Sequence, residues 1–271
     1  MDKFELLETY TRQQRIELDY PDIKREVEGS VVRQISLAGE DGFVIYSRLD
    51  GETAEAAIAA QIARFQSIQQ DFEWKVYDYD LPKDLVDRLR RRGFEIGEPE
   101  ALLVLDLTSR PEALIHTVPL SVMRITDPGE VDAVVALENA VWGTDHHDLG
   151  EFLKRELREH PEMVSVYLSF QGQQLASAAW IFFHPGSSFA SLWGGSTLPL
   201  FRNQGHYTHL LAARAQEAWA RGFTLLTVDA SPMSRPILEK HGFQYLATST
   251  PCKWRITRKT IPLPGDQGGG V

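Results

Sequence analysis

The sequence predicts an α/β fold built from two similar units. Short apolar runs with strand-like alternation are separated by amphipathic runs at helical spacing throughout the 271 residues. The order helix, strand, short helix, Gly-Phe, strand describes residues 52–107 and again residues 206–254. Gly93-Phe94 and Gly242-Phe243 hold the same place in the two halves. We interpret this order as an internal repeat, although unrelated halves of an α/β chain could share it.

The first half alternates strands with helices. Its β-branched and aromatic runs favour strands, and alanines at helical spacing favour a long helix near residue 60. Gly93 ends the second helix, because glycine is the usual residue just past a helix. The predicted elements are strands at 31–36 and 42–48, a helix at 52–69, a strand at 74–79, a helix at 81–92 and a strand at 101–107.

The second half begins with two helices and continues with three apolar strands before the repeated segment. A polar loop, residues 142–147, separates the two helices. The predicted elements are helices at 128–141 and 148–159, strands at 163–170, 174–183 and 189–195, a helix at 209–221, a strand at 224–229 and a short helix at 231–241.

Proline and glycine mark the boundaries between these parts. Pro111 and Pro119 interrupt the periodicity, so we expect one domain at 1–110 and a second at 119–256. Residues 257–271 contain two prolines and three consecutive glycines, and we expect them to form a disordered tail.

Composition indicates an ordinary globular protein, with 43% apolar and 24% charged residues. The single cysteine, Cys252, excludes an intramolecular disulfide and any site with several cysteine ligands. No apolar stretch approaches the roughly 20 residues of a membrane span, and the first residues lack the pattern of a signal peptide. We therefore expect a cytoplasmic protein with no membrane partner.

The net charge of −10 is concentrated in the first half. Residues 1–119 carry 24 acidic and 15 basic side chains, a net −9. A nucleic acid partner needs a basic face, so we expect none. The acidic half either maintains solubility or steers a cationic substrate such as an amine.

The most informative stretch is the loop at residues 196–208. An apolar strand leads into it and an amphipathic helix leads out, so the free N–H groups and positive end of that helix converge on one spot. Gly205 lets the backbone approach a ligand closely, and Arg202 can add a bidentate contact. The loop therefore predicts a phosphate or pyrophosphate site.

The spacing Arg-x-x-Gly after Leu-Pro resembles the coenzyme A loop of the GNAT acetyltransferases. The later strand, short helix and Gly242-Phe243 follow in the order of that family. The resemblance implies two GNAT-like units, each with a mixed, mostly antiparallel sheet flanked by helices, and acetyl-CoA as co-substrate. In the first unit the matching loop, residues 49–55, has three carboxylates and no Arg or Lys, so we expect a degenerate unit without a cofactor site.

The resemblance also assigns the cofactor residues. Most members of the GNAT family carry a small residue at the position of Tyr207. Many members carry a tyrosine, which acts as the general acid, at the position of Leu238. The expected cofactor-binding residues are Thr197, Leu198, Arg202, Asn203, Gln204, Gly205, His206, Tyr207, Thr208, Ser231 and Ser234.

The acceptor side is less constrained by the sequence. Glu138 and Asp229 are the candidate catalytic bases, although each could serve as a cap or salt-bridge partner. Trp142, Asp145 and Trp193 come from segments that border the acceptor side, with core packing as the alternative for the tryptophans. His146-His147 are adjacent in a loop and do not have the spacing of a chelating pair, so we expect no metal.

These observations favour an acetyl-CoA-dependent N-acetyltransferase acting on a small-molecule amine. A non-catalytic acyl-CoA sensor is the alternative, because Leu238 cannot donate a proton. The sequence lacks the Gly-x-Gly-x-x-Gly and Lys-Ser/Thr motifs of nucleotide-binding domains. The sequence does not specify the acceptor. We also consider a homodimer, although no motif in the sequence requires one.

Overall fold

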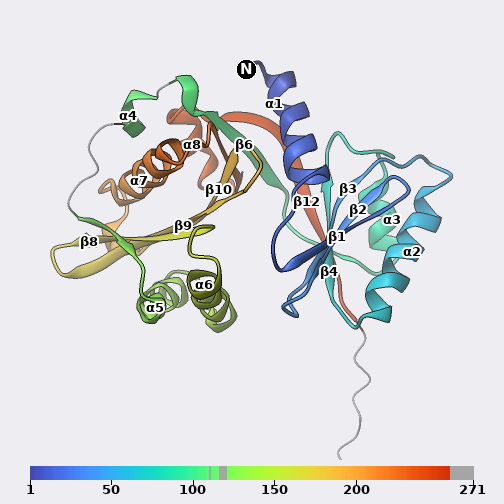
Figure 1. Cartoon of the computed structure of the whole chain (residues 1–271), viewed down its shortest axis with the longest axis horizontal. Helices are drawn as coiled ribbons and strands as arrows, with labels where there is room; N and C mark the ends of the chain where they lie inside the picture. Colours follow the sequence, from blue (N-terminus) through green and yellow to red (C-terminus); the bar gives the residue numbers. More distant parts are fainter. Residues whose placement is uncertain (110, 116–120, 257–271) are drawn as a thin grey trace, which may run out of the picture. The chain divides into compact units, whose positions relative to one another are not determined.

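A computed structural model describes residues 1–109, 111–115 and 121–256 (Figure 1). The chain forms two compact units. The first contains residues 1–23, 77–79 and 98–250, and the second contains residues 24–76, 80–97 and 251–256, within the described ranges. The predicted disordered tail, residues 257–271, lies outside the described residues.

The first unit is built on a mixed, mostly antiparallel sheet, as predicted. The strands are paired antiparallel except for β10 and β11, which are parallel. Across the sheet the order is β12 (Gln244–Trp254), β6 (Glu100–Asp106), β11 (Leu225–Ala230), β10 (Phe189–Thr197), β9 (Gln174–Phe183), β8 (Val164–Gln171) and β7 (Val122–Ile125).

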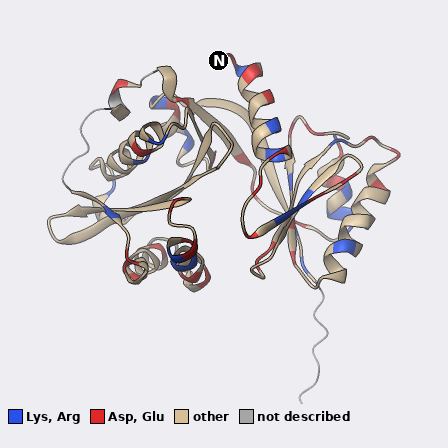
Figure 2. Cartoon of the chain, in the orientation of Figure 1, with Lys and Arg blue, Asp and Glu red and all other residues tan. Residues whose placement is uncertain are grey.

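Helices cover both faces of this sheet (Figure 1). α7 (His206–Ala220) and α8 (Arg235–Lys240) pack on one face through a core that includes Leu210 and Leu238. On the opposite face, α5 (Val131–Trp142) and α6 (His147–Glu159) pack through Leu137 and Leu153 on β8 and β9. The central strands β8, β9 and β10 carry no charged residue, which suits burial on both faces (Figure 2). The short helical segments of this unit are η2 (Leu107–Ser109), α4 (Glu112–Ile115), η3 (Pro128–Glu130) and η4 (Pro199–Phe201).

The N-terminal segment belongs to the first unit, which differs from the predicted boundary at residue 110. α1 (Lys3–Tyr10) begins with an Asp2–Glu5 capping box and continues into a π-helical turn, η1 (Thr11–Ile16). Leu6 and Tyr10 pack against Phe189 of β10 in a buried cluster. β6 also joins this unit, because it lies between β11 and β12. Long-range strand pairing therefore overrides the chain order that suggested one domain at 1–110 and another at 119–256.

The second unit is smaller. Its core contains the stacked rings of Phe65 and Phe72 together with Trp254. β3 pairs antiparallel with β2 and parallel with β4, and β5 pairs antiparallel with the end of β12. The elements are β1 (Ile23–Glu28), β2 (Val31–Ser36), β3 (Gly42–Ser47), α2 (Ala54–Ser67), β4 (Phe72–Tyr77), α3 (Leu85–Arg91) and β5 (Glu95–Ile96).

Most predicted elements occur as the predicted type, with shifted ends. The helix predicted at 209–221 begins at His206, and the short helix predicted at 231–241 is limited to Arg235–Lys240. The sequence analysis missed α1, β1, β5, α4 and β7. None of the helices within the described ranges is long and apolar enough to cross a membrane.

Candidate acetyl-transfer site

The centre of the site is an opening between two parallel strands. β10 and β11 pair from Phe189 opposite Leu225 to Ser191 opposite Thr227, and the pairing stops there. β10 continues to Thr197 and β11 to Ala230. The two strands therefore separate and leave unpaired backbone edges that could hold an extended ligand.

A bulge in β10 borders this opening. The register with β9 shifts between Gly194 and Ser196, so Gly195 is the extra residue and leaves the ladder. Gly194 and Gly195 have φ angles of 67° and 93°. A Cβ on Gly194 would lie 2.4 Å from the Trp180 ring, and one on Gly195 would lie 2.7 Å from Tyr207. Glycine is thus required at both positions for conformation and for space.

A buried arginine supports the bulge from the α7 side. Arg214 of α7 donates hydrogen bonds at 3.1 Å to the carbonyl oxygens of both Trp180 and Trp193. Burial lowers the pKa of Arg214 to about 10, so the side chain remains charged at neutral pH. A fixed positive charge therefore lies directly behind the strand segment that forms the bulge.

The predicted phosphate loop forms the entry to α7. Gly205 is the N-cap with a φ of 87°, and no described side chain caps this helix end. Arg202 donates from Nε to the Thr197 carbonyl at 3.2 Å, and Gln204 donates to the Leu200 carbonyl at 2.9 Å. Asn203 also has a positive φ of 61°. The loop is thus folded by its own side chains while the first-turn N–H groups of α7 have no capping side chain.

The other predicted cofactor residues have varied surroundings. The Thr197 hydroxyl bonds to Ser177 at 2.8 Å, and the Leu198 N–H donates to the Ala176 carbonyl. The Leu198 N–H is therefore engaged within the sheet. Thr208 lies 3.3 Å from His241, and Ser231 caps the turn that leads into α8 through the Ser234 N–H at 3.3 Å.

Two histidines lie at the start of α7. The Nδ1 atom of His206 bonds to Ser169 at 2.8 Å, and burial lowers the pKa of His206. His206 Nε2 and His209 Nδ1 are both buried without a hydrogen-bond partner among the described residues. The His209 ring lies beside Gly205, because a Cβ on that glycine would be 3.5 Å from it.

Glu138 is the better placed of the two predicted bases. It is only 3% exposed, and its Oε2 accepts from Ser196 at 2.8 Å and from the Trp142 indole at 2.9 Å. Oε1 is buried and has no partner among the described residues. Burial raises the pKa of Glu138, more than its two hydrogen bonds lower it. Ser196 follows the bulge directly, so α5 delivers a carboxylate to the rim of the opening.

Asp229 and Leu238 lie elsewhere around the opening. Asp229 belongs to the end of β11 that continues beyond the pairing with β10, and its Oδ1 accepts from Ser249 at 3.4 Å. Leu238 is completely buried in the core beneath α8. It therefore presents no polar atom to a ligand, and a tyrosine at this position would have to enter a packed core.

Two of the three predicted acceptor residues have exposed rings. Trp142 is 56% exposed and Trp193 is 52% exposed. Asp145 instead accepts from the His147 N–H at 3.1 Å and so stabilises the start of α6. The structure therefore brings Trp142 to Glu138 and Ser196, while Asp145 has a local structural contact.

The sequence analysis missed a hydrogen-bonded chain behind Trp193. The Trp193 indole donates to Ser191 at 2.8 Å, Ser191 bonds to His184 Nε2 at 2.9 Å, and His184 Nδ1 lies 2.5 Å from the Tyr20 hydroxyl. Burial lowers the pKa of His184 to about 3, so this histidine is neutral. Alternation along β10 places Ser191 on the same face as Trp193, but no sequence pattern connects either residue with Tyr20.

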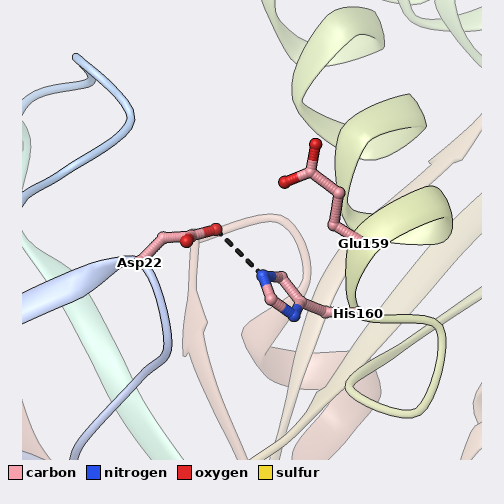
Figure 3. Close-up of side chains that lie close together, drawn as sticks. All are labelled: Asp22, Glu159 and His160. Atoms are coloured by element: carbon pink, nitrogen blue, oxygen red, sulfur yellow. Dashed lines mark hydrogen bonds and ion pairs between the residues drawn. The ribbon is translucent and has the colours of Figure 1, made fainter.

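One group of potential metal ligands occurs in the described part of the first unit. Ligand atoms of Asp22, Glu159 and His160 lie within 4.8 Å of one another (Figure 3). His160 Nε2 and Asp22 form a hydrogen bond of 2.9 Å, whereas the Glu159 side chain is exposed. The hydrogen bond between Asp22 and His160 explains why these two residues lie together, and the expected absence of a metal stays a prediction.

The chain was compared with known proteins. No family model matches it, and no curated protein matches it by sequence. It is similar in structure to a GCN5-related N-acetyltransferase from Kribbella flavida, with a TM-score of 0.63, 16% identity and 93% of each chain covered. A conserved protein of unknown function from Staphylococcus epidermidis matches with a TM-score of 0.62 and 13% identity, over 86% of this chain and 94% of that one.

A tandem GNAT protein from the clavulanic acid biosynthesis pathway also matches. The TM-score is 0.53 at 14% identity, with 89% of this chain and 85% of that chain covered. The matches extend over nearly the whole chain, so both units take part in the likeness. The resemblance to GNAT acetyltransferases in a tandem arrangement is thus confirmed at the level of the fold.

Proposed function

Because the chain has the fold of the GNAT acetyltransferases, we propose that it transfers an acetyl group from acetyl-CoA to the amine of a small molecule. The single observation that carries this proposal is the position of Glu138. A buried carboxylate with one unpartnered oxygen lies next to the β10 bulge, at the strand opening that is continuous with the phosphate loop.

The co-substrate would lie along the strand opening with its phosphates at the start of α7. The uncapped N–H groups of that helix and the Arg202 guanidinium are the anion donors. The unpaired edges of β10 and β11 would accept the extended arm. This arrangement brings the thioester to the bulge, where the off-ladder backbone of Gly195 could stabilise an oxyanion.

Glu138 would accept the proton of the attacking amine. The amine nitrogen then forms a bond to the thioester carbon, the carbon–sulfur bond breaks, and the thiolate leaves with the electron pair. A thiol has a pKa of about 8.5, so the anion is an adequate leaving group without a side-chain acid. The buried Leu238 is compatible with this scheme, because the scheme requires no proton donor at that position.

The test combines binding and turnover. Calorimetry with acetyl-CoA should give one site per chain, and Gly205→Glu should abolish it, because the substitution adds a carboxylate and strains a backbone with a φ of 87°. Thiol release from acetyl-CoA should then depend on an added amine. Binding without amine-dependent release across a broad panel would favour the sensor, and undiminished binding by Gly205→Glu would remove the cofactor assignment.

A further inference from the structure

The acceptor side of the site has two indole rings that are exposed and yet fixed. The Trp142 indole N–H donates to Glu138 and, at 3.0 Å, to Ser196. The Trp193 indole N–H donates to Ser191. Both anchoring serines belong to β10. Each tryptophan therefore holds its polar atom against the protein and leaves much of its ring accessible.

Strand register places these groups on one face of the sheet. Across the β9–β10 ladder, Ser191 lies opposite Phe182, Trp193 opposite Trp180 and Ser196 opposite Ala178. Directly opposed residues of an antiparallel pair project to the same side. Ala178 and Trp180 are covered by α5 and α6, so this is also the face that receives Glu138 and Trp142. The two rings thus lie on the same face as Glu138, with the glycine bulge between Trp193 and Ser196.

The position of Trp193 is supported from behind. Its ring packs edge-on against Phe182, with centroids 6.3 Å apart, and the Ser191–His184–Tyr20 chain holds its N–H. His184 and Ser191 are both buried, so this support is shielded from water. A large exposed aromatic side chain that is held by a buried network is more typical of a binding surface than of ordinary surface variation.

We propose that the acceptor is an aryl-bearing primary amine, a class that deepens the proposed acetyl transfer and rests on it. The aromatic body would contact the indoles of Trp142 and Trp193 while the amine lies beside Glu138, whose Oε1 has no partner among the described residues. Indole faces attract flat apolar groups and cations. The buried Glu138 carboxylate suits one amine rather than a polycation, which would need several compensating charges.

The decisive experiment is a substrate comparison at constant pH. Wild-type protein is assayed with 2-phenylethylamine and with butylamine, which present a primary amine with and without an aromatic ring. We expect kcat/KM to be about tenfold or more higher for the aryl amine, the range of one or two aromatic contacts. In Trp193→Leu and in Trp142→Leu this ratio should fall towards one.

Trp219→Leu is the matched control, because Trp219 is 41% exposed on α7 and lies on the opposite side of the sheet. It should retain the wild-type ratio. Ser191→Ala tests the support of Trp193, and should raise KM for the aryl amine more than it lowers kcat. Fluorescence quenching by 2-phenylethylamine without acetyl-CoA should weaken in Trp193→Leu, which gives a readout independent of turnover.

The outcomes separate this inference from the proposed function. Efficient acetylation of both amines with a ratio near one, or a ratio that survives in both tryptophan variants, would overturn the aryl preference and leave acetyl transfer intact. Amine-dependent thiol release from neither compound nor from a broad amine panel would overturn acetyl transfer, and the acceptor class would fall with it.

Discussion

The two units contain the same strand–helix–strand arrangement but differ at the start of the helix. β3, α2 and β4 in the second unit correspond to β10, α7 and β11 in the first, and in each case the parallel pairing covers three residue pairs. Asp50 lies four residues before α2, and Arg202 lies four residues before α7. The same position thus carries opposite charges in the two loops.

This exchange changes what the helix end can bind. Asp50 accepts from the N–H groups of Glu52 and Thr53 at 2.9 and 2.8 Å and from the Thr53 hydroxyl at 2.8 Å. The loop before α2 is therefore closed by its own carboxylate. Among the described residues neither helix has a capping side chain, and the loop before α7 carries a guanidinium at the position of this carboxylate. One strand–loop–helix arrangement can thus lead to a turn closed by its own carboxylate or to a loop that presents a cation, depending on a few loop residues.

The units also differ in the helices ahead of the strands. In the first unit, α5 brings Glu138 and Trp142 to the β10 bulge. The described residues of the second unit begin with strands β1, β2 and β3 and have no corresponding helix pair. A second acetyl-transfer site would therefore lack both its anion loop and its base.

The largest expected effect comes from making the α7 loop resemble the α2 loop. Arg202→Asp should reduce acetyl-CoA binding below detection, because the new carboxylate repels the phosphates and can cap the helix itself. Arg202→Asn, which can cap without charge, and Arg202→Ala should each weaken binding by about 10- to 100-fold. Calorimetry on the three variants checks the order. Near wild-type affinity in Arg202→Asp would show that the charge at this loop position does not decide whether acetyl-CoA binds.

Removal of the base should have the next largest effect. Glu138→Gln keeps the shape of the side chain and should lower kcat by about 10²- to 10⁴-fold while acetyl-CoA still binds. In the wild type, kcat/KM should rise with pH as Glu138 ionises, with an apparent pKa above the usual glutamate range because of burial. The pH–rate profile of both proteins tests this. An unchanged rate in Glu138→Gln would show that Glu138 is not the base and would leave Asp229 as the candidate.

Acid should destabilise the first unit before the second. All eight histidines of the sequence lie between residues 116 and 241, outside the second unit. Burial lowers the pKa of His184 to about 3, so the unfolded chain binds this proton more readily. The contribution of neutral His184 to the free energy of unfolding is fully present above about pH 6.5. Between about pH 6.5 and pH 3 it falls by up to about 1.4 kcal/mol per pH unit.

The second unit should stay folded to a lower pH than the first unit. The pKa of Glu26 is lowered by its hydrogen bond to Arg64, so this contribution is present above the usual glutamate pKa and is lost only below it. Hydrogen exchange measured between pH 7 and pH 4 should therefore show earlier loss of protection in β9 and β10 than in β2 and β3. His184→Asn should reduce the difference, and equal loss in both units would contradict it.

The smallest expected effect is on the turn that Asp50 closes before α2. Asp50→Ala removes the three contacts in its loop and should lower Tm by only about 2–4 °C. Asp50→Asn should retain most of the stability, since an amide oxygen can accept the same hydrogen bonds. Neither variant should create a second acetyl-CoA site. A stoichiometry above one per chain in calorimetry would show that the two loops are less different than the contacts indicate.

The elements could be predicted because their signals are local. A short apolar run identified strands such as β9, and Arg202 with Gly205 marked the loop before α7, whose binding of an anion stays a prediction. α1 also has a local signal, the Asp2–Glu5 capping box, which the analysis overlooked. The ends of the helices shifted because capping and packing decide them residue by residue.

By itself the sequence determined the mixed α/β fold, the repeated strand–helix–strand order and the opposite charges of the two loops. These follow from residues close together in the chain. Only the tertiary structure decided that residues 1–23 join the first unit, that Leu238 is buried in the core, and that Glu138, Trp142 and Ser196 meet at the bulge. Glu138 and Ser196 are 58 positions apart, and contacts at that separation depend on packing between elements, which periodicity does not encode.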